Sequence, residues 1–259
     1  MLFMLVAGAA AAILFALFPQ WDIAFTNLFW HPSRGGFSLA LSPWARTLRA
    51  WGNYIPWAIA IPAFVAIVLK IIFPMGRMFM RARAALLLAL TMALGPGLLV
   101  NGLLKQEWGR PRPVHVEQYG GQLDFKGWYE TDGTCPSNCS FVSGEGALGF
   151  WMVAPASLVP PGPLRVIALI GAVAFGFLAG GLRIAFGGHF FTDVLFSGVL
   201  VVTLISFTRF WLYDWNRAPT DEQAENAIGW VGLALRKGLY KMYRAIQRLL
   251  GRGQKDTVG

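Results

Sequence analysis

The chain alternates between long apolar segments and short polar connections. Each apolar segment is close to the length that an α-helix needs to cross a hydrocarbon layer of roughly 30 Å, once tilt and flanking residues absorb small differences. The fourth segment is the weakest, because Pro155 interrupts it and the run VPPGP closes it early; neighbouring helices can satisfy the carbonyl that a proline leaves free. The pattern predicts membrane-spanning helices at residues 2–18, 54–73, 84–104, 146–159, 164–182 and 194–213.

Composition also indicates a membrane protein. Hydrophobic residues make up 56% of the 259 residues, charged residues make up 14%, and the mean hydropathy is +0.52, which is far from the values of soluble domains. The small residues AGAAAA in the first segment are typical of a signal peptide, but no lysine or arginine precedes them and the apolar run continues to Phe18. We therefore expect a retained span and an all-α integral membrane fold with six transmembrane helices.

Basic residues in the connections predict the orientation. Much of the positive charge lies in the second and fourth connections and in the tail, which fall on one side if the spans alternate. Because cytoplasmic connections carry an excess of Lys and Arg, we expect this side and both termini to be cytoplasmic. Connections one, three and five should then face the periplasm, and the net charge of +9 needs no nucleic-acid partner. The residues concerned are Arg77, Arg81, Arg83, Arg165, Arg217, Arg236, Lys237, Lys241, Arg244, Arg248, Arg252 and Lys255.

The tail differs from the rest of the chain. Residues 1–215 read as one membrane domain, whereas residues 216–259 form a basic cytoplasmic tail. From residue 228 to residue 250 the tail alternates apolar and basic faces, as in LALRKGLYKMYRAIQRLL. This pattern favours an amphipathic helix lying on an anionic lipid surface; a partner-binding helix and a solvated tail are the alternatives.

The two later outward connections contain polar residues at regular spacing. Lys105 is followed after six residues by Arg112 and Pro113; a Ser143–Gly144 pair comes next; and Arg183, His189 and Asp193 are separated by five and three residues. These three motifs resemble, in the same order, the K-x6-R-P, P-S-G-H and S-R-x5-H-x3-D signatures of the type-2 phosphatidic acid phosphatase family. The resemblance covers the chain from the third span to the sixth, and the family also has six spans.

The resemblance implies a phosphate monoesterase that needs no metal or other cofactor. Lys105, Arg112 and Arg183 would hold the phosphoryl oxygens, together with the Ser143 hydroxyl and the N–H groups of Gly144 and Glu145 at a helix N-terminus. The family implies that His189 is the nucleophile and forms a phosphohistidine. Asp193, four residues later, would share a helix face with His189, fix its tautomer and favour its cationic form.

The chain departs from the family signatures at three positions. Val142 and Glu145 replace the proline and the histidine of the second signature, and Leu182 replaces the serine of the third. The missing histidine is the family's general acid. Glu145 could take over this role if burial raises its pKa; alternatively, it stays ionised and binds a hydroxyl or amide of the head group, while water protonates the leaving oxygen.

Other polar residues in the outward connections are assigned smaller roles. Cys135 and Cys139 lie just before Ser143, and in an oxidising compartment we expect a disulfide between them that fixes this loop. We interpret Arg110 as a supporting or surface residue. His31 and His115 have no partner that the sequence identifies, and we interpret both as structural.

The sequence leaves the substrate open among several classes. A site at the outer membrane face suits a phosphorylated lipid, and the family acts on phosphatidic acid, phosphatidylglycerol phosphate, polyprenyl diphosphates such as undecaprenyl diphosphate, and lipid A. The run NCSFVSGEGA looks most like the branch that removes phosphate from lipid A, with the 4′-position as one option, and this branch implies a bacterial inner membrane. A non-catalytic lipid binder or transporter is the remaining class; the intact His189 and Asp193 argue against it, as does the small number of charges within the spans.

Overall fold

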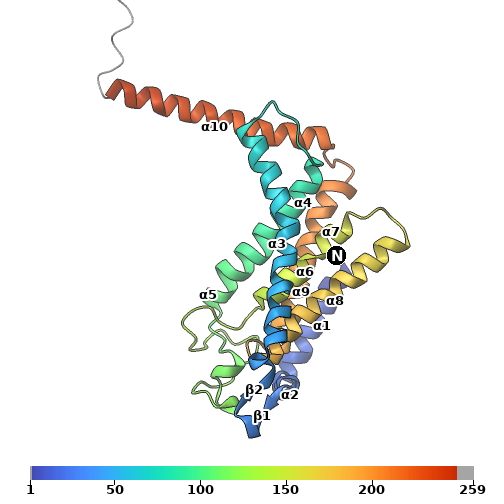
Figure 1. Cartoon of the computed structure of the whole chain (residues 1–259), viewed down its shortest axis with the longest axis vertical. Helices are drawn as coiled ribbons and strands as arrows, with labels where there is room; N and C mark the ends of the chain where they lie inside the picture. The colour runs from blue at the N-terminus through green and yellow to red at the C-terminus, as the bar shows by residue number, and fades with distance from the viewer. Residues whose placement is uncertain (1, 250–259) are drawn as a thin grey trace, which may run out of the picture.

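The computed structural model describes residues 2–249, and apart from the irregular segment 108–143 its secondary structure is almost entirely helical (Figure 1). The exception is a hairpin of two-residue strands, in which Trp30 pairs with Phe37 and His31 with Gly36. The elements are α1 (Leu2–Leu17), α2 (Gln20–Asn27), β1 (Trp30–His31), β2 (Gly36–Phe37), α3 (Pro43–Ile72), α4 (Ala82–Met92), a π-helical continuation (Ala93–Leu104), α5 (Lys105–Glu107), α6 (Gly144–Trp151), α7 (Val153–Ser157), α8 (Pro163–Ala185), α9 (Phe191–Arg209), a second π-helical turn (Phe210–Asp214) and α10 (Asp221–Leu249). Single 3₁₀ turns lie at Pro32–Arg34, Ser38–Leu41, Pro113–His115 and Glu117–Tyr119.

Among the described residues, four helices are long and apolar enough to cross a membrane: Pro43–Ile72, Ala82–Glu107, Pro163–Ala185 and Phe191–Asp214. A fifth span is added if α1 and α2 count as one, although the chain bends by 92° between them. The all-helical membrane fold is thus confirmed, whereas six separate spans are not. The difference lies mainly in the expected fourth span, 146–159, which is divided between α6 and α7.

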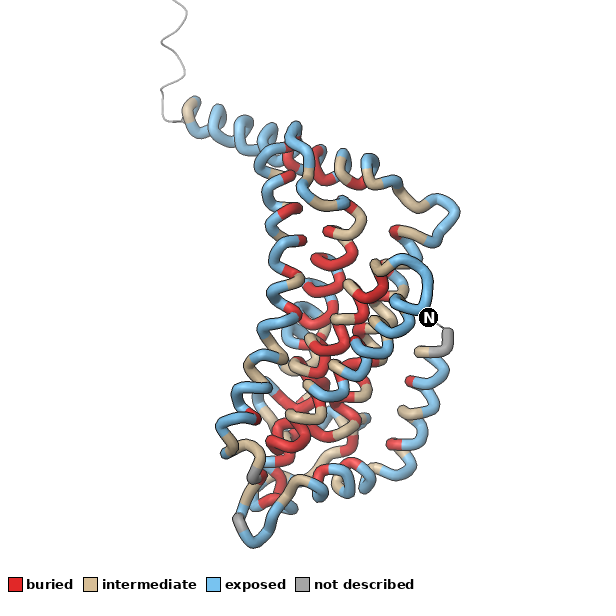
Figure 2. Tube along the Cα trace, turned by 45° about the vertical axis from the view of Figure 1, so that its right-hand side comes forward, coloured by how far each residue is buried: buried red, intermediate tan, exposed pale blue. Residues whose placement is uncertain are grey.

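The division of this segment follows from its sequence. Pro155 has no N–H to donate to the carbonyl of Trp151, and the helix breaks at Met152. Most of α6 is buried, including Phe150 and Trp151, and Figure 2 shows buried residues gathered along the middle of the bundle. The indole N–H of Trp151 donates to the Thr91 hydroxyl of α4 at 3.0 Å. A short, mostly apolar helix is typical of a buried core element, and α6 occupies this position.

The two ends of the bundle carry different chemistry. The family-signature residues Ser143 and His189 lie at the starts of α6 and α9, toward the end that carries the β-hairpin (Figure 1). At the opposite end, Arg209 donates to the carbonyl of Ser157 at 2.9 Å, and Arg83 pairs with Asp221 at 3.4 Å. The basic connections and the beginning of the tail therefore meet at one end of the bundle, and the candidate site lies at the other.

Helix α10 extends sideways from the basic end (Figure 1). It begins at Asp221, seven residues before the predicted start at 228. Lys70 of α3 pairs with Glu225 at 3.0 Å, and Ala224 and Ile228 pack against Ala82 of α4. The first turns of α10 are thus fixed to the bundle. The predicted tail continues beyond the described residues from residue 250 onward.

Candidate active site

The junction between α8 and α9 places the third signature around one point. Arg183 lies in the last turn of α8, His189 lies in the short connection, and Asp193 lies in the first turn of α9. The Asp193 carboxylate caps α9 by accepting the N–H of Phe190 at 2.8 Å. A Cβ on Gly188 would lie 2.3 Å from Nη2 of Arg183, so a larger residue at this position would displace the guanidinium.

His189 is a buried histidine backed by a carboxylate. Its side chain is 1% exposed, and its Nδ1 lies 3.5 Å from Oδ2 of Asp193. Burial lowers the pKa of His189 to about 4, although the neighbouring Asp193 opposes this effect. The ring is therefore neutral near pH 7. With Nδ1 directed at Asp193, Nε2 is the ring nitrogen left to act as a nucleophile.

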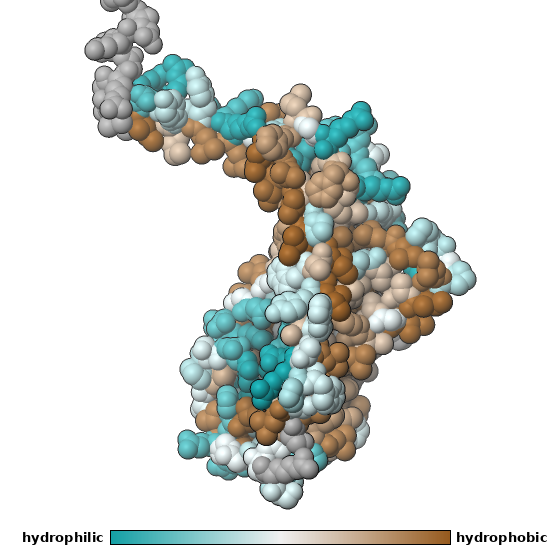
Figure 3. Space-filling model, viewed as in Figure 1, coloured by the Kyte–Doolittle hydropathy of each residue, from teal (hydrophilic) through white to brown (hydrophobic). Residues whose placement is uncertain are grey.

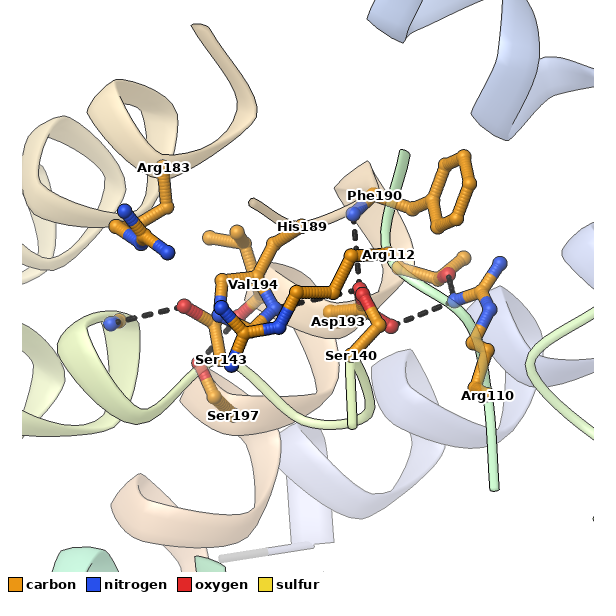
Figure 4. A network of polar contacts seen from close by, with 12 residues as sticks. Arg110, Arg112, Ser140, Ser143, Arg183, His189, Phe190, Asp193, Val194 and Ser197 are labelled. Atoms are coloured by element: carbon orange, nitrogen blue, oxygen red, sulfur yellow. Dashed lines mark hydrogen bonds and ion pairs between the residues drawn. The ribbon is translucent and has the colours of Figure 1, made fainter. Parts of the chain in front are cut away.

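Asp193 is held by further donors (Figure 4). Ser140 donates its hydroxyl to Oδ2 at 2.5 Å, and Nη1 of Arg110 donates to Oδ1 at 2.6 Å. Arg110 is fully buried, and it also contacts Asp22 at 2.8 Å and Thr192 at 2.8 Å. The structure therefore makes Arg110 a supporting residue that orients Asp193, and not a surface residue.

The three cations of the first and third signatures come from separate segments. Nζ of Lys105 lies beside Gly144; a Cβ atom placed on this glycine would be 3.0 Å from it. Arg112 donates from Nη2 to both the carbonyl oxygen and Oδ1 of Asn138 at 2.7 Å. Burial lowers the pKa of Arg112, but an arginine remains protonated under such conditions. Lys105, Arg112 and Arg183 thus supply positive charge on the His189 side of the bundle.

The loop that carries Asn138 is closed by a disulfide between Cys135 and Cys139. The sequence analysis expected this bond to fix the segment before Ser143. In the structure, the loop also contacts Arg112 directly through Asn138. The N–H of Cys139 donates to the carbonyl of Lys105 at 2.9 Å. The disulfide loop therefore connects the two ends of the first signature.

Ser143 is the N-cap of α6. Its Oγ accepts the N–H of Gly146 at 3.1 Å, and its own N–H donates to the carbonyl of Asp193 at 3.0 Å. The N–H groups of Gly144 and Glu145 belong to the first turn, where a helix has no internal acceptors for them. These groups lie at a helix N-terminus, the position where the sequence predicted an anion site.

Glu145 is bound by two arginines. Nε of Arg49, from α3, lies 3.0 and 2.9 Å from its two carboxylate oxygens, and Nε of Arg183 lies 3.4 Å from Oε1. Burial raises the pKa of Glu145, but hydrogen bonds from Arg49 and the charges of both arginines outweigh it, so the pKa lies below its usual value. Of the two roles left open by the sequence, these contacts favour an ionised Glu145.

The structure places three residues at the site that sequence reasoning missed, and it places two loop histidines away from the site. Arg49, Asn138 and Asp22 lie outside the three signatures, yet each contacts a signature residue or its support. His31 and His115 are exposed and lie in the hairpin and a 3₁₀ turn. Among residues 2–249, no hydrogen bond or ion pair joins either histidine to His189.

The geometry agrees with the comparison to known proteins. The PAP2 superfamily matches residues 84–218, which is more than half of the chain. The chain belongs to the PAP2 superfamily. The family resemblance inferred from the three motifs is thus confirmed. No solved structure gave a match.

Several PAP2 relatives are similar over long stretches. A "Lipid A 4′-phosphatase" of Francisella tularensis subsp. novicida (strain U112) is 35% identical over 197 residues, covering 74% of this chain and 86% of the relative. A protein of the same name from Rhizobium leguminosarum is 34% identical over 217 residues, covering 77% and 92%. A third, from Rhizobium etli, is 41% identical over 120 residues, covering 45% and 46%. Asp22 and Arg49 lie before the matched PAP2 segment, which begins at residue 84.

Proposed function

We propose that the protein is a membrane lipid phosphatase that removes a phosphate monoester from lipid A, with the 4′-phosphate as the first candidate. The observation that carries this proposal is a buried His189 whose Nδ1 lies 3.5 Å from Oδ2 of Asp193, with the cations of the PAP2 signatures on the same side of the bundle. The similarity to three proteins named lipid A 4′-phosphatase supports the choice of lipid.

The reaction has two displacement steps. In the first, Nε2 of His189 attacks phosphorus, the bond from phosphorus to the sugar oxygen breaks, and that oxygen takes a proton from water. The positive charge that develops on the ring is stabilised by Asp193. In the second, a water molecule attacks the phosphohistidine, the phosphorus–nitrogen bond breaks, and inorganic phosphate leaves. Lys105, Arg112, Arg183 and the N-terminus of α6 stabilise the equatorial oxygens in both steps.

Glu145 has a supporting electrostatic role in this scheme. An ionised carboxylate beside a phosphate dianion is unfavourable by itself. The ion pairs with Arg49 and Arg183 offset this repulsion and hold both guanidinium groups at the rim of the site. Arg49 therefore supplements the three cations of the signatures, and Glu145 fixes its orientation.

The pH dependence should reveal the unusual titration of His189. A pKa lowered to about 4 means that the neutral, nucleophilic form dominates at every higher pH and is lost as pH falls through this value. After correction for the ionisation of the substrate phosphate, kcat/KM should therefore stay level from neutral pH down to about pH 5 and decline below it. A decline centred at the ordinary histidine pKa of about 6.5 would contradict the lowered value.

An apolar groove beside the site supports a lipid substrate. It lies between α3 and α8, has a volume of about 390 Å³, and is lined by residues such as Trp51, Ile55 and Leu178. Two further lining residues, Leu48 and Leu182, directly precede Arg49 and Arg183. A lipid with its phosphate at these arginines would place an acyl chain in the groove.

Filling the groove should separate lipid from soluble substrates. Gly181 lines the groove, and a Cβ there meets no atom within 4 Å. Gly181→Phe should lower kcat/KM for lipid A about tenfold, as expected when a hydrophobic pocket rejects part of its ligand. Hydrolysis of p-nitrophenyl phosphate should be unchanged. Val166→Phe, at an exposed position of the same helix, is the matched control, and equal losses for both substrates would contradict acyl binding in the groove.

Phosphate release from a lipid panel tests the function directly. The purified protein would be assayed in detergent with a chelator, using lipid A, phosphatidylglycerol phosphate, phosphatidic acid and undecaprenyl diphosphate, beside His189→Ala. Release mainly from lipid A, and none from the variant, supports the proposal. Release mainly from another lipid keeps the reaction and rejects the substrate. No release from any lipid would support a binding protein.

The proposed location is a bacterial inner membrane with the site at the periplasmic face. The excess of basic residues at the opposite end of the bundle supports this orientation, because cytoplasmic connections are enriched in Lys and Arg. The same orientation puts both termini and α10 on the cytoplasmic side. An amine-labelling reagent that cannot cross membranes should then modify Lys126 in the outward connection, and not Lys237 or Lys241 of α10, in intact spheroplasts.

Helix α10 has the geometry of a helix that lies in a lipid surface. An apolar stripe begins with Ala224 and Ile228, which pack against the bundle, and continues as exposed side chains. Figure 3 shows hydrophobic atoms along the edge of α10 that faces the bundle and hydrophilic atoms along the opposite edge. The stripe continues with Val231, Leu235, Leu239, Met242 and Ile246, and the opposite face carries Lys237, Lys241, Arg244 and Arg248. Anionic lipid head groups are the partner that fits this face.

Environment-sensitive labels on α10 should distinguish the two faces. Both native cysteines are in the disulfide, so Leu239→Cys and Lys241→Cys can be labelled separately with a nitrobenzoxadiazole dye without reductant. In vesicles containing phosphatidylglycerol, we expect blue-shifted emission at position 239 and aqueous emission at position 241. Aqueous emission at both positions would indicate a solvated tail.

A further inference from the structure

Asp22 lies far from the signatures in sequence but next to them in space. It belongs to α2, directly after the first apolar helix, and is 1% exposed. Its Oδ2 accepts from Nη2 of Arg110 at 2.8 Å and from the hydroxyl of Thr192 at 2.5 Å. Its Oδ1 accepts the backbone N–H of Thr192 at 2.9 Å. Every one of these donors is adjacent to Asp193 in sequence or bonded to it.

The guanidinium of Arg110 lies between two carboxylates. Nη1 contacts Asp193 at 2.6 Å and Nη2 contacts Asp22 at 2.8 Å, with the guanidinium and both carboxylates almost completely buried. The ring of Phe190 lies 4.5 Å from the guanidinium carbon and closes this side. Burial strengthens such interactions, because little water is present to screen them.

The net charge of this buried group bears on the reaction. Two carboxylates and one guanidinium leave one negative charge beside His189. Without Asp22, the charges of Arg110 and Asp193 would cancel. The imidazole would then gain its positive charge beside a buried group that has no net charge, so this group would stabilise the imidazolium less.

We propose that Asp22 is a positioning residue of the active site, which balances Arg110 and fixes Thr192 so that Asp193 keeps its orientation and charge for His189. The inference rests on the proposed phosphatase function. Asp22 does not touch substrate in this role; it acts through Arg110 and Asp193. It also makes α2, which precedes the matched PAP2 segment, part of the catalytic unit.

The test compares Asp22→Asn with Asp221→Asn. Both substitutions remove a carboxylate from an ion pair with an arginine, but the pair of Asp221 with Arg83 lies at the opposite end of the bundle. For Asp22→Asn we expect kcat to fall about tenfold while KM stays within about twofold, because the phosphate-binding cations are unchanged. Asp221→Asn should leave both constants unchanged. Amounts of folded protein are matched by size-exclusion chromatography in detergent.

A second readout reports on His189 without turnover. The chain has three histidines, so protein labelled with ¹⁵N-histidine and purified through a histidine-free tag gives few imidazole signals. In the wild type, His189 should show a protonated Nδ1 and an unprotonated Nε2; Asp22→Asn should shift this tautomer equilibrium, and Asp221→Asn should not. If Asp22→Asn fails to fold, Thr192→Val takes its place. For this variant we expect kcat to fall about threefold while KM stays nearly unchanged.

The outcomes separate this proposal from the proposed function. Unchanged kcat and unchanged His189 signals in the Asp22→Asn protein, or in Thr192→Val where that variant is used, would overturn the positioning role, as would a loss of thermal stability alone. If the wild-type protein releases no phosphate from any lipid, the proposed function fails. The tautomer measurement would still decide whether Asp22 controls His189.

Discussion

Replacing His189 with alanine should abolish phosphate release, with a loss of at least about 10³-fold in kcat, because His189 is the group that accepts the phosphoryl group in the proposed reaction. Neighbouring residues keep their contacts in this variant, since the Nδ1 of His189 is not the main partner of Asp193; Arg110, Ser140 and the N–H of Phe190 hold that carboxylate. The protein should therefore fold and still bind inorganic phosphate. Rapid acid-free quenching with ³²P-labelled substrate should trap labelled protein in the wild type and none in the variant.

Asp193→Asn provides the graded control for this prediction. The amide keeps the approximate shape but removes the charge that stabilises the imidazolium, so turnover should fall strongly while some labelled intermediate still forms. Turnover by His189→Ala above about 1% of wild type would show that another nucleophile acts, since loss of a nucleophile removes far more of the rate. Such a result would require a different mechanism at the same site.

Replacing Glu145 with glutamine should lower kcat/KM by at least about tenfold, because it removes a charge-assisted contact worth about 1.5–3 kcal/mol. Arg49→Gln should produce a similar loss, since Arg49 is held mainly by Glu145. If the two residues act as a pair, the double variant should lose little more than either single one. Measuring kcat/KM for the wild type, the two single variants and the double variant tests this coupling.

The leaving group distinguishes an ion-paired Glu145 from a general acid. p-Nitrophenolate leaves without protonation, whereas a sugar alkoxide does not. A general acid would matter only for the sugar phosphate, so Glu145→Gln would then hydrolyse p-nitrophenyl phosphate normally. We expect losses with both substrates, because the substitution disturbs Arg49 and Arg183 in either case. Glu145→His, which restores the family residue, should rescue neither loss.

Much of the bundle could be predicted from hydropathy, and the core of the site from motif spacing. The expected spans 164–182 and 194–213 correspond closely to α8 and to α9 with its π-helical end. The second span was expected to begin at residue 54, but α3 begins at Pro43. Its first turns carry Arg46 and Arg49, which lower the hydropathy without interrupting the helix, and Arg49 reaches Glu145 of the site.

The missed residues had signals that local spacing does not use. Arg46 and Arg49 precede a span on the side that is expected to face outward. Arginine is enriched in cytoplasmic connections, so the orientation of the chain does not explain these two arginines. Asp22 is an acidic residue directly after an apolar span, a position where charges are often functional. Their partners could not be named, because Glu145 is 96 residues from Arg49, and Thr192 is 170 residues from Asp22.

The long separation of Asp22 from its partners also has a consequence for the biogenesis of the protein. During synthesis, Asp22 leaves the ribosome early, and Arg110 and Thr192 follow 88 and 170 residues later. Until they arrive, the nascent chain carries an acidic group at the membrane boundary without its final neutralising contact. Chains that terminate before residue 192 cannot complete this contact. The cluster around Asp22 is therefore completed only when the start of α9 has been synthesised.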